Sequence, residues 1–220
     1  METDVKKIRA VLFDLDGVLV DACEWHYLSL NKALKDLVGI EISRKQHIEE
    51  YNGLPTRVKL KNLGIAGEIA EKVWKLKQKL TVDIIEKNSH TLKEKIELHS
   101  FLRRNRIKIC CVTNSIRQTA YLMLKNTGQL EFVDFLLTNE DVENNKPYPD
   151  CYNLAVDMLN IDPSEILIVE DSPKGVKAAE NSVVDKLWKV KNASEVTLSN
   201  YRRYMDENFN TYGGRGKPIC

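Results

Sequence analysis

The feature that most constrains the fold is the stretch of residues 8–21, IRAVLFDLDGVLVD. Its apolar run, residues 10–13, has the length and composition of a strand that is buried on both faces. Asp14 and Asp16 follow directly, and Gly17 supplies a permissive backbone where the chain must turn. Because residues two apart in a strand share a face, both carboxylates are expected just beyond the strand's carboxyl end. Open α/β sheets bind their ligands at that edge.

Two neighbouring carboxylates repel each other unless a cation or a shared proton compensates their charge. A pair of oxygen ligands of this kind suits Mg²⁺. The same residues also fit a plainer interpretation, an aspartate-rich turn after a buried strand. The choice between the two depends on what the rest of the chain places beside this strand.

Further along the chain, apolar runs alternate with amphipathic segments. The runs predict strands at 107–112, 132–137, 166–169 and 187–190, and the periodic segments predict helices at 91–104, 116–125, 150–159, 174–181 and 192–209. This alternation indicates an α/β fold with a Rossmann-like parallel sheet that is covered by helices on both faces.

The segment 22–90 carries no strand signal. Its periodicity and turn residues predict helices at 24–37, from Ser43 onward, at 55–63 and at 68–87. We therefore expect a helical cap subdomain at 22–90, inserted after the first strand, and an α/β core made of 1–21 and 91–212. Residues 213–220 show no core-forming pattern and are expected to be disordered. A cap that leaves and re-enters the fold beside Asp14 is well placed to act as a lid.

Composition narrows the class of protein. The 33 basic and 32 acidic residues are well mixed and give a net charge of +1, which favours neither a nucleic acid nor a membrane as the main partner. The five cysteines form no metal-binding or disulfide framework, which is typical of a reducing compartment. Without a signal-peptide pattern or a long apolar run, we expect a cytoplasmic protein.

Polar residues follow three of the predicted buried strands. Asp14 and Asp16 end the first, Thr113 begins a Thr-Asn-Ser segment after the second, and residues 170–172, Glu-Asp-Ser, end another. Lys146 lies in a proline-flanked loop between the last two. Each has a plainer role open to it: a strand-end cap for Thr113, a solvated loop lysine for Lys146, and a helix N-cap for the acidic segment. In a parallel sheet, however, such residues gather in one cleft.

This ordered set closely resembles the four motifs of the haloacid dehalogenase superfamily, whose members mostly cleave phosphate esters. The resemblance covers 8–21 and 91–190 and, more loosely, the cap. It implies that Asp14 is the nucleophile that takes the phosphoryl group as an aspartyl-phosphate. It also implies that Asp16 protonates the leaving group and then activates water. An acid at the position of Asp16 favours phosphate chemistry over dehalogenation within this superfamily.

The same resemblance implies roles for three further residues. Thr113 would hold a phosphoryl oxygen through its hydroxyl, with backbone amides near Asn114 assisting. Lys146 would neutralise the nucleophile and the transferring group. The physical reason agrees, because a dianionic phosphoryl group repels a carboxylate nucleophile until a cation and fixed donors absorb that charge.

A magnesium site follows from the resemblance as well. Asp14, Asp171 and the backbone carbonyl of Asp16 would bind Mg²⁺, and Glu170 would either bind it directly or hold one of its waters. Mg²⁺ is thus the cofactor that we expect.

The cap resembles those of β-phosphoglucomutase-like and phosphoglycolate-phosphatase-like members. His26 matches a hinge histidine, Arg57 lies in a segment similar to their specificity loop, and Lys77 aligns with a cap lysine that enters the site. These residues would contact substrate. Plainer alternatives stay open: His26 can simply pack in the hinge, and Lys77 is one of several lysines on its helix.

We therefore expect a Mg²⁺-dependent phosphatase of a small phosphorylated metabolite, present as a monomer or weak homodimer. One alternative is a sugar-phosphate mutase that passes the aspartyl-phosphate to another hydroxyl. Another is a non-catalytic binding protein that keeps the fold. Two segments depart from the family pattern, 90–93 where the cap returns to the core and 181–182 after the last motif. Both departures affect the hinge and the last strand rather than the catalytic set.

Overall fold

A five-stranded parallel sheet forms the centre of the computed structural model, which describes residues 7–209. Its strands lie in the order β3-β2-β1-β4-β5, with all neighbouring pairs parallel. They are β1 (Ala10–Phe13), β2 (Lys108–Val112), β3 (Phe135–Leu137), β4 (Ile166–Glu170) and β5 (Lys186–Lys189). The strand β1, whose four residues are all apolar and buried, is central, as its burial on both faces requires.

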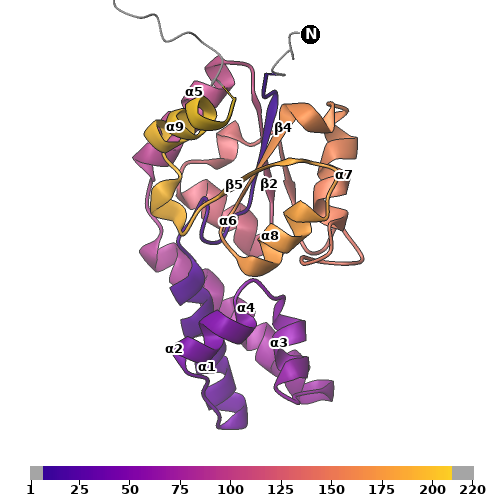
Figure 1. The fold of residues 1–220 in the computed structure, drawn as a ribbon. Helices are drawn as coiled ribbons and strands as arrows, with labels where there is room; N and C mark the ends of the chain where they lie inside the picture. The colour runs from indigo at the N-terminus through magenta and orange to yellow at the C-terminus, as the bar shows by residue number, and fades with distance from the viewer. Residues whose placement is uncertain (1–6, 210–220) are drawn as a thin grey trace, which may run out of the picture.

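Alternating side chains of β1 supply two hydrophobic cores. Val11 and Phe13 pack under α5 (Lys93–Arg104), α6 (Arg117–Asn126) and α9 (Leu198–Phe209). Ala10 and Leu12 pack on the opposite face under α7 (Asp150–Leu159) and α8 (Pro173–Glu180). Figure 1 shows these two helical layers on either side of the sheet. The predicted α/β fold with helices on both faces is confirmed.

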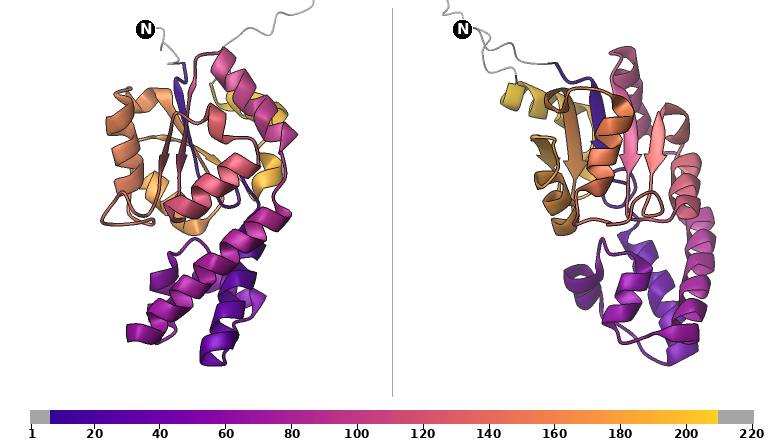
Figure 2. Two further views of the ribbon diagram at one scale, coloured as in Figure 1. Left: turned by 180° about the vertical axis from the view of Figure 1, so that it is seen from behind. Right: turned by 90° about the vertical axis from the view of Figure 1, so that its right-hand side faces the viewer.

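The segment between β1 and α5 is helical. It contains α1 (Cys23–Val38), α2 (Arg44–Gln46), a π-helical turn (His47–Tyr51), α3 (Thr56–Asn62) and α4 (Gly67–Asn88). None of residues 22–90, all of which the structure describes, lies in a strand. These helices, here called the cap helices, gather beyond the carboxyl ends of the strands (Figure 1, Figure 2). They enclose a small core of their own, in which Leu30, Leu34, Leu60 and Val73 are buried.

Most predicted helices end within two residues of their expected limits, and α7 spans 150–159 as expected. Within residues 7–209, no helix has the length and apolarity needed to cross a membrane. The expected tail at 213–220 lies outside the described residues.

The predicted strand at 132–137 is half as long as expected. A 3-10 turn occupies Leu130–Phe132, and β3 begins only at Phe135. The turn's apolar side chains pack on the core under α5 and α6, so burial does not require an extended chain there. Asp134 then aligns the strand, because its backbone and carboxylate both pair with the backbone of Ile109.

Two predicted helix starts were also wrong. Asn192 caps only a 3-10 turn, Ala193–Glu195, and α9 begins at Leu198. The ammonium of Lys95 donates hydrogen bonds to the carbonyl oxygens of Ala193 and Val196, so these oxygens do not continue a helical hydrogen-bond ladder. The helix predicted to start at 91 begins at Lys93, because Leu92 is its N-cap residue and no side chain caps it.

Candidate active site

A buried ion-pair network lies at the end of β1. The ammonium of Lys146 donates hydrogen bonds of 2.8 Å to Oδ1 of Asp14 and 2.7 Å to Oε1 of Glu170. A third bond, of 2.8 Å, goes to the carbonyl oxygen of Val112 at the end of β2. The Lys146 side chain is only 3% exposed. The plainer alternative, a solvated loop lysine, therefore does not describe Lys146.

The surrounding residues hold this lysine in place. The side-chain amide of Asn114 pairs with the backbone of Lys146 in both directions, at 3.1 Å each. The ring of Tyr152 lies under the ammonium, and its hydroxyl donates a 2.6 Å hydrogen bond to Glu170. The Lys146–Pro147 peptide bond is cis. The network thus joins three strand ends and the loop before α7.

Carboxylate oxygens of Asp14, Glu170 and Asp171 lie within 4.8 Å of one another. Burial raises the pKa of Asp171 to about 7, and repulsion from Glu170 adds to this. Burial also raises the pKa of Asp14 far above its usual range, although Lys146 works against this. Oδ1 of Asp171 is buried and has no hydrogen-bond partner within the described structure. An all-oxygen set with uncompensated negative charge fits a divalent cation such as Mg²⁺.

Two glycines make room for these acids. Gly17 adopts a φ of +88°, and a Cβ atom there would overlap the carboxylate of Asp171. Gly175, on α8, is packed so closely that a Cβ atom would overlap the carboxylate of Glu170. Sequence reasoning recognised Gly17 but missed Gly175. The available signal was that Gly175 follows Ser172, the N-cap residue of α8, by three positions. The amide of Gly175 donates a hydrogen bond to the Ser172 hydroxyl.

The carboxylate of Asp16 lies outside the acid cluster and belongs to a second network. Its Oδ1 is 2.8 Å from Nε2 of His26, and its Oδ2 accepts a 2.6 Å hydrogen bond from Ser115, a residue missing from the predicted site. Nδ1 of His26 is 3.2 Å from the Lys77 ammonium. An ammonium has no lone pair, so it donates to Nδ1, and the Nε2 hydrogen then points at Asp16.

The pKa values of this network follow from its geometry. Burial alone would raise the pKa of Asp16, but His26 and Ser115 together lower it to about 2. Burial lowers the pKa of His26, which agrees with a neutral ring between an ammonium and a carboxylate. His26 is therefore more than hinge packing, because it joins a cap helix to the end of β1.

A cavity of about 470 Å³ lies beside these networks and is lined by residues of both the core and the cap helices. It is large enough for a small organic phosphate rather than for the phosphoryl group alone. Eight of the predicted site residues line it: Asp14, Asp16, His26, Arg57, Lys77, Thr113, Asn114 and Lys146. Glu170 and Asp171 do not line it, and Glu170 is fully buried behind Asp14 and Lys146. Thr113 accepts a hydrogen bond from the Ser115 amide, which leaves its hydroxyl hydrogen able to donate elsewhere.

Two basic residues of α3 line this cavity. Arg57 pairs with Glu71 at 2.8 Å and stacks over the ring of Trp74, so its charge already has partners. Lys59, which was not predicted, lines the cavity and is 5% exposed. Its only sequence signal was its position two residues after Arg57.

Hydrogen bonds also join the cap to the core beside the cavity. The amide of Asn114 donates to the carbonyl oxygen of Gly53 at 2.8 Å. The ammonium of Lys174, on α8, donates to the carbonyl oxygens of Asn52 and Glu50 at 2.8 and 3.2 Å. The π-helical turn and the loop after it are therefore held against the core.

Comparison with known proteins agrees with this architecture. Residues 11–189 match the haloacid dehalogenase-like hydrolase family. The chain is 28% identical to a phosphorylated carbohydrates phosphatase of Thermotoga maritima over 186 residues, which cover 83% of this chain and 85% of the relative. It is also 28% identical to pyrophosphatase PpaX of Bacillus velezensis over 199 residues, 89% of this chain and 90% of the relative.

Among solved structures, β-phosphoglucomutase from Clostridium difficile shares the fold. The TM-score is 0.76 at 24% sequence identity, covering 93% of this chain and 98% of that chain. The family match spans most of both parts of the fold, so the chain belongs to the haloacid dehalogenase-like hydrolases. Within that family it is an enzyme of the phosphoric monoester hydrolase class.

Proposed function

We propose that this protein is a Mg²⁺-dependent phosphatase that hydrolyses a small phosphorylated metabolite through an aspartyl-phosphate. One observation carries the proposal. The carboxylate of Asp14 pairs with the Lys146 ammonium, lies within 4.8 Å of carboxylate oxygens of Glu170 and Asp171, and lines a cavity sized for a small organic phosphate. A nucleophile, a cation and a place for a second cation are thus together at one strand end.

In the first step, an oxygen of Asp14 bonds to phosphorus while the bond between phosphorus and the ester oxygen breaks. Asp16 gives a proton to the departing oxygen. The pKa of Asp16 is about 2 in the substrate-free protein, so it is ionised there at neutral pH. A dianionic phosphoryl group arriving beside it raises that pKa, because like charges disfavour the ionised form.

In the second step, Asp16 takes a proton from water, whose oxygen attacks phosphorus. The bond between phosphorus and Asp14 then breaks, which releases inorganic phosphate and restores the carboxylate. The roles of acid and base alternate on one residue, which requires that its two protonation states be close in energy once substrate is bound.

Fixed donors absorb the charge of the transferring group. Lys146 neutralises Asp14 and the phosphoryl oxygens, and its three hydrogen bonds hold it rigidly. The hydroxyl of Thr113 and backbone amides near Asn114 are the further donors that we assign to these oxygens. Donors positioned before the reaction need no reorganisation as charge develops.

The residues that would hold Mg²⁺ are Asp14, Asp171 and the backbone carbonyl of Asp16, with Glu170 binding either directly or through a water. When bound, the cation withdraws negative charge from the phosphoryl oxygens. The unpartnered Oδ1 of Asp171 supports this assignment.

We further propose that residues 22–90 act as a cap over a core made of 1–21 and 91–212. His26, Arg57 and Lys77 are the cap residues that we assign to substrate binding or to orienting Asp16. The buried, unpaired thiols of Cys110, Cys111 and Cys151 support a reducing, cytoplasmic location.

The test is phosphate release from a panel of phosphorylated metabolites, with Mg²⁺ and with EDTA. Asp14→Asn is compared with Asp21→Asn, the control at an exposed aspartate near the end of the same motif. We expect turnover by the wild type and by the control with Mg²⁺, and none by Asp14→Asn or with EDTA.

Activity that survives Asp14→Asn would overturn the aspartyl-phosphate. Isomerisation of a sugar phosphate without release of phosphate would support the mutase alternative. A folded wild type that neither hydrolyses nor isomerises any member of the panel would leave the non-catalytic binding protein.

A further inference from the structure

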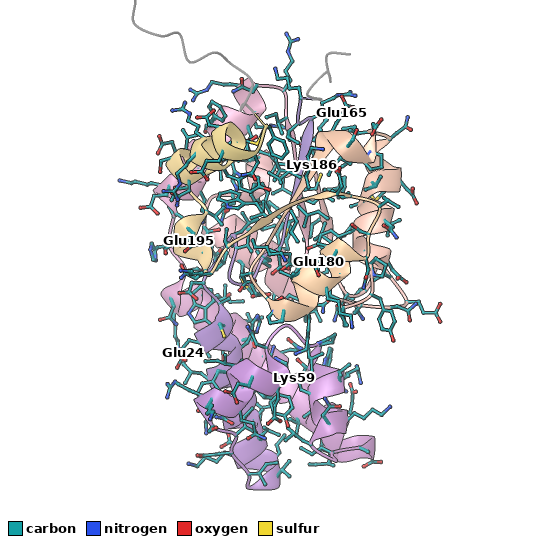
Figure 3. All side chains as sticks on the ribbon, in the orientation of Figure 1. Glu24, Lys59, Glu165, Glu180, Lys186 and Glu195 are labelled. Atoms are coloured by element: carbon teal, nitrogen blue, oxygen red, sulfur yellow. The ribbon has the colours of Figure 1, made fainter. Side chains whose placement is uncertain are left out.

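Lys59 is a buried cation on the wall of the cavity. It lies on α3, and Figure 3 labels it within the cap helices. Its side chain lines the cavity that also contains Asp14 and Asp16. Within the described structure it makes no hydrogen bond or ion pair, whereas Arg57 on the same helix has both Glu71 and Trp74. A cation removed from water is costly unless an anion compensates it.

No neighbouring acid satisfies Lys59. The carboxylate that attracts it most is Asp16, but within the described structure Asp16 pairs with His26 and Ser115 and makes no hydrogen bond or ion pair with Lys59. Burial lowers the pKa of Lys59 to about 8, so the ammonium remains the main form at neutral pH. The free lysine is therefore available to a ligand.

The cap wall of the cavity is positively charged. Lys77 also lines it, and burial together with Lys59 lowers the pKa of Lys77 to about 7. The cap residues that line the cavity, all between 26 and 78, include no aspartate or glutamate. An anion bound there would stabilise both ammonium groups at once.

We propose that Lys59, supported by Lys77, binds a second anionic group of the substrate. The substrate class is thus a small phosphate monoester that carries a carboxylate or a second phosphoryl group besides the phosphate that is cleaved. The assignment rests on the proposed function for the position of the first phosphate. It differs from the resemblance-based expectation for Arg57, whose charge is compensated on the cap itself.

Equilibrium binding tests this without relying on turnover. Asp14→Asn protein is titrated calorimetrically, with Mg²⁺, against phosphoglycolate and hydroxyethyl phosphate, which differ in a carboxylate against a neutral hydroxymethyl group. A hexose bisphosphate and the corresponding monophosphate form the second pair. The readout is the ratio of dissociation constants within each pair, which cancels binding of the shared phosphate.

Lys59→Gln is introduced into this background, with Lys61→Gln, an exposed lysine on the same helix, as the matched control. Losing a charge-assisted hydrogen bond should reduce the preference for the doubly anionic ligand by about 10- to 100-fold. The pair with the larger loss shows whether the second group is a carboxylate or a phosphoryl group. We expect the control to keep the wild-type ratios.

A ratio that Lys59→Gln leaves unchanged in both pairs would overturn the inference, as would equal losses for Lys59→Gln and Lys61→Gln. Absence of a preference for either doubly anionic ligand before substitution would overturn it too. Failure of the proposed function is a separate result, because it appears as missing phosphate release by the wild type while binding is still measured.

Discussion

Replacing Lys146 by methionine tests the central ion-pair network most directly. The substitution preserves much of the side-chain volume but removes an ammonium that binds Asp14, Glu170 and the carbonyl oxygen of Val112 at 2.7 to 2.8 Å. Removing one partner of a buried ion pair leaves uncompensated charge, which costs ~3–5 kcal/mol. We expect the free energy of unfolding at pH 7 to fall by about that amount, as measured by urea denaturation.

A second substitution separates charge balance from loss of contacts. Glu170→Gln in the Lys146→Met background removes one of the two carboxylates that have lost their ion-pair partner. It keeps an oxygen that accepts the hydrogen bond from Tyr152. We expect it to restore on the order of 2 kcal/mol, because replacing both partners is much less costly than removing one. Phosphate release should stay at least ~100-fold below that of the wild type in both variants.

The control is Lys177→Met, at an exposed lysine on α8, which should change stability by less than ~0.5 kcal/mol. The loss of unfolding free energy in Lys146→Met should also become smaller as the pH falls. The reason is that Asp14, whose pKa is raised by burial, then takes up a proton and loses its charge. A loss below ~1 kcal/mol, or no rescue by Glu170→Gln, would refute the reasoning about uncompensated charge.

Three further predictions follow from single positions. Gly17→Ala and Gly39→Ala both place a side chain at positive φ, which should lower the free energy of unfolding by ~1–2 kcal/mol in each case. Only the Cβ atom at position 17 would also overlap the carboxylate of Asp171. Calorimetry should therefore show weakened Mg²⁺ binding for Gly17→Ala alone, and equal binding by both variants would contradict this. Burial lowers the pKa of His99 from 6.5 to about 4. As the pH falls from 6.5 to about 4, His99 is therefore protonated in the unfolded chain before it is protonated in the folded protein. The free energy of unfolding should fall over this range by on the order of 3 kcal/mol. His99→Leu should flatten the urea-derived stability profile between these pH values, and an unchanged slope would count against it. Lys174→Met removes one hydrogen bond to the π-helical turn and one to the loop after it, so hydrogen exchange in this segment should accelerate by roughly 10-fold. Unaltered protection would show that other contacts hold the cap.

Patterns local to the chain predicted the sheet and its functional edge. The apolar runs at β1, β2 and β4 are long and uniform, and burial on both faces follows from that composition whatever the tertiary details. Since parallel strands end at the same edge, the polar residues after each run had to meet. Where local signals were weak, as in the three-residue strand β3, the prediction of element limits was wrong because packing decided the conformation.

Pairing between distant side chains could not be predicted in the same way. Ser115 and Asp16 are separated in sequence by the whole of residues 22–90 and one α/β unit, and no local pattern says that one donates to the other. Gly175 is needed only because the Glu170 side chain occupies the space where its Cβ atom would lie. Such requirements arise from close approach in three dimensions, which sequence spacing does not encode.

The sequence by itself determined the class of fold, the order of its motifs and the identity of the acids at the end of β1. These depend on hydrophobic periodicity and on the chemistry of single residue types. Only the tertiary structure decided which cations were already paired. Glu71 and Trp74 compensate Arg57, whereas Lys59 is buried with no acid paired to it among residues 7–209. The charge that a side chain presents to a ligand depends on such neighbours in space.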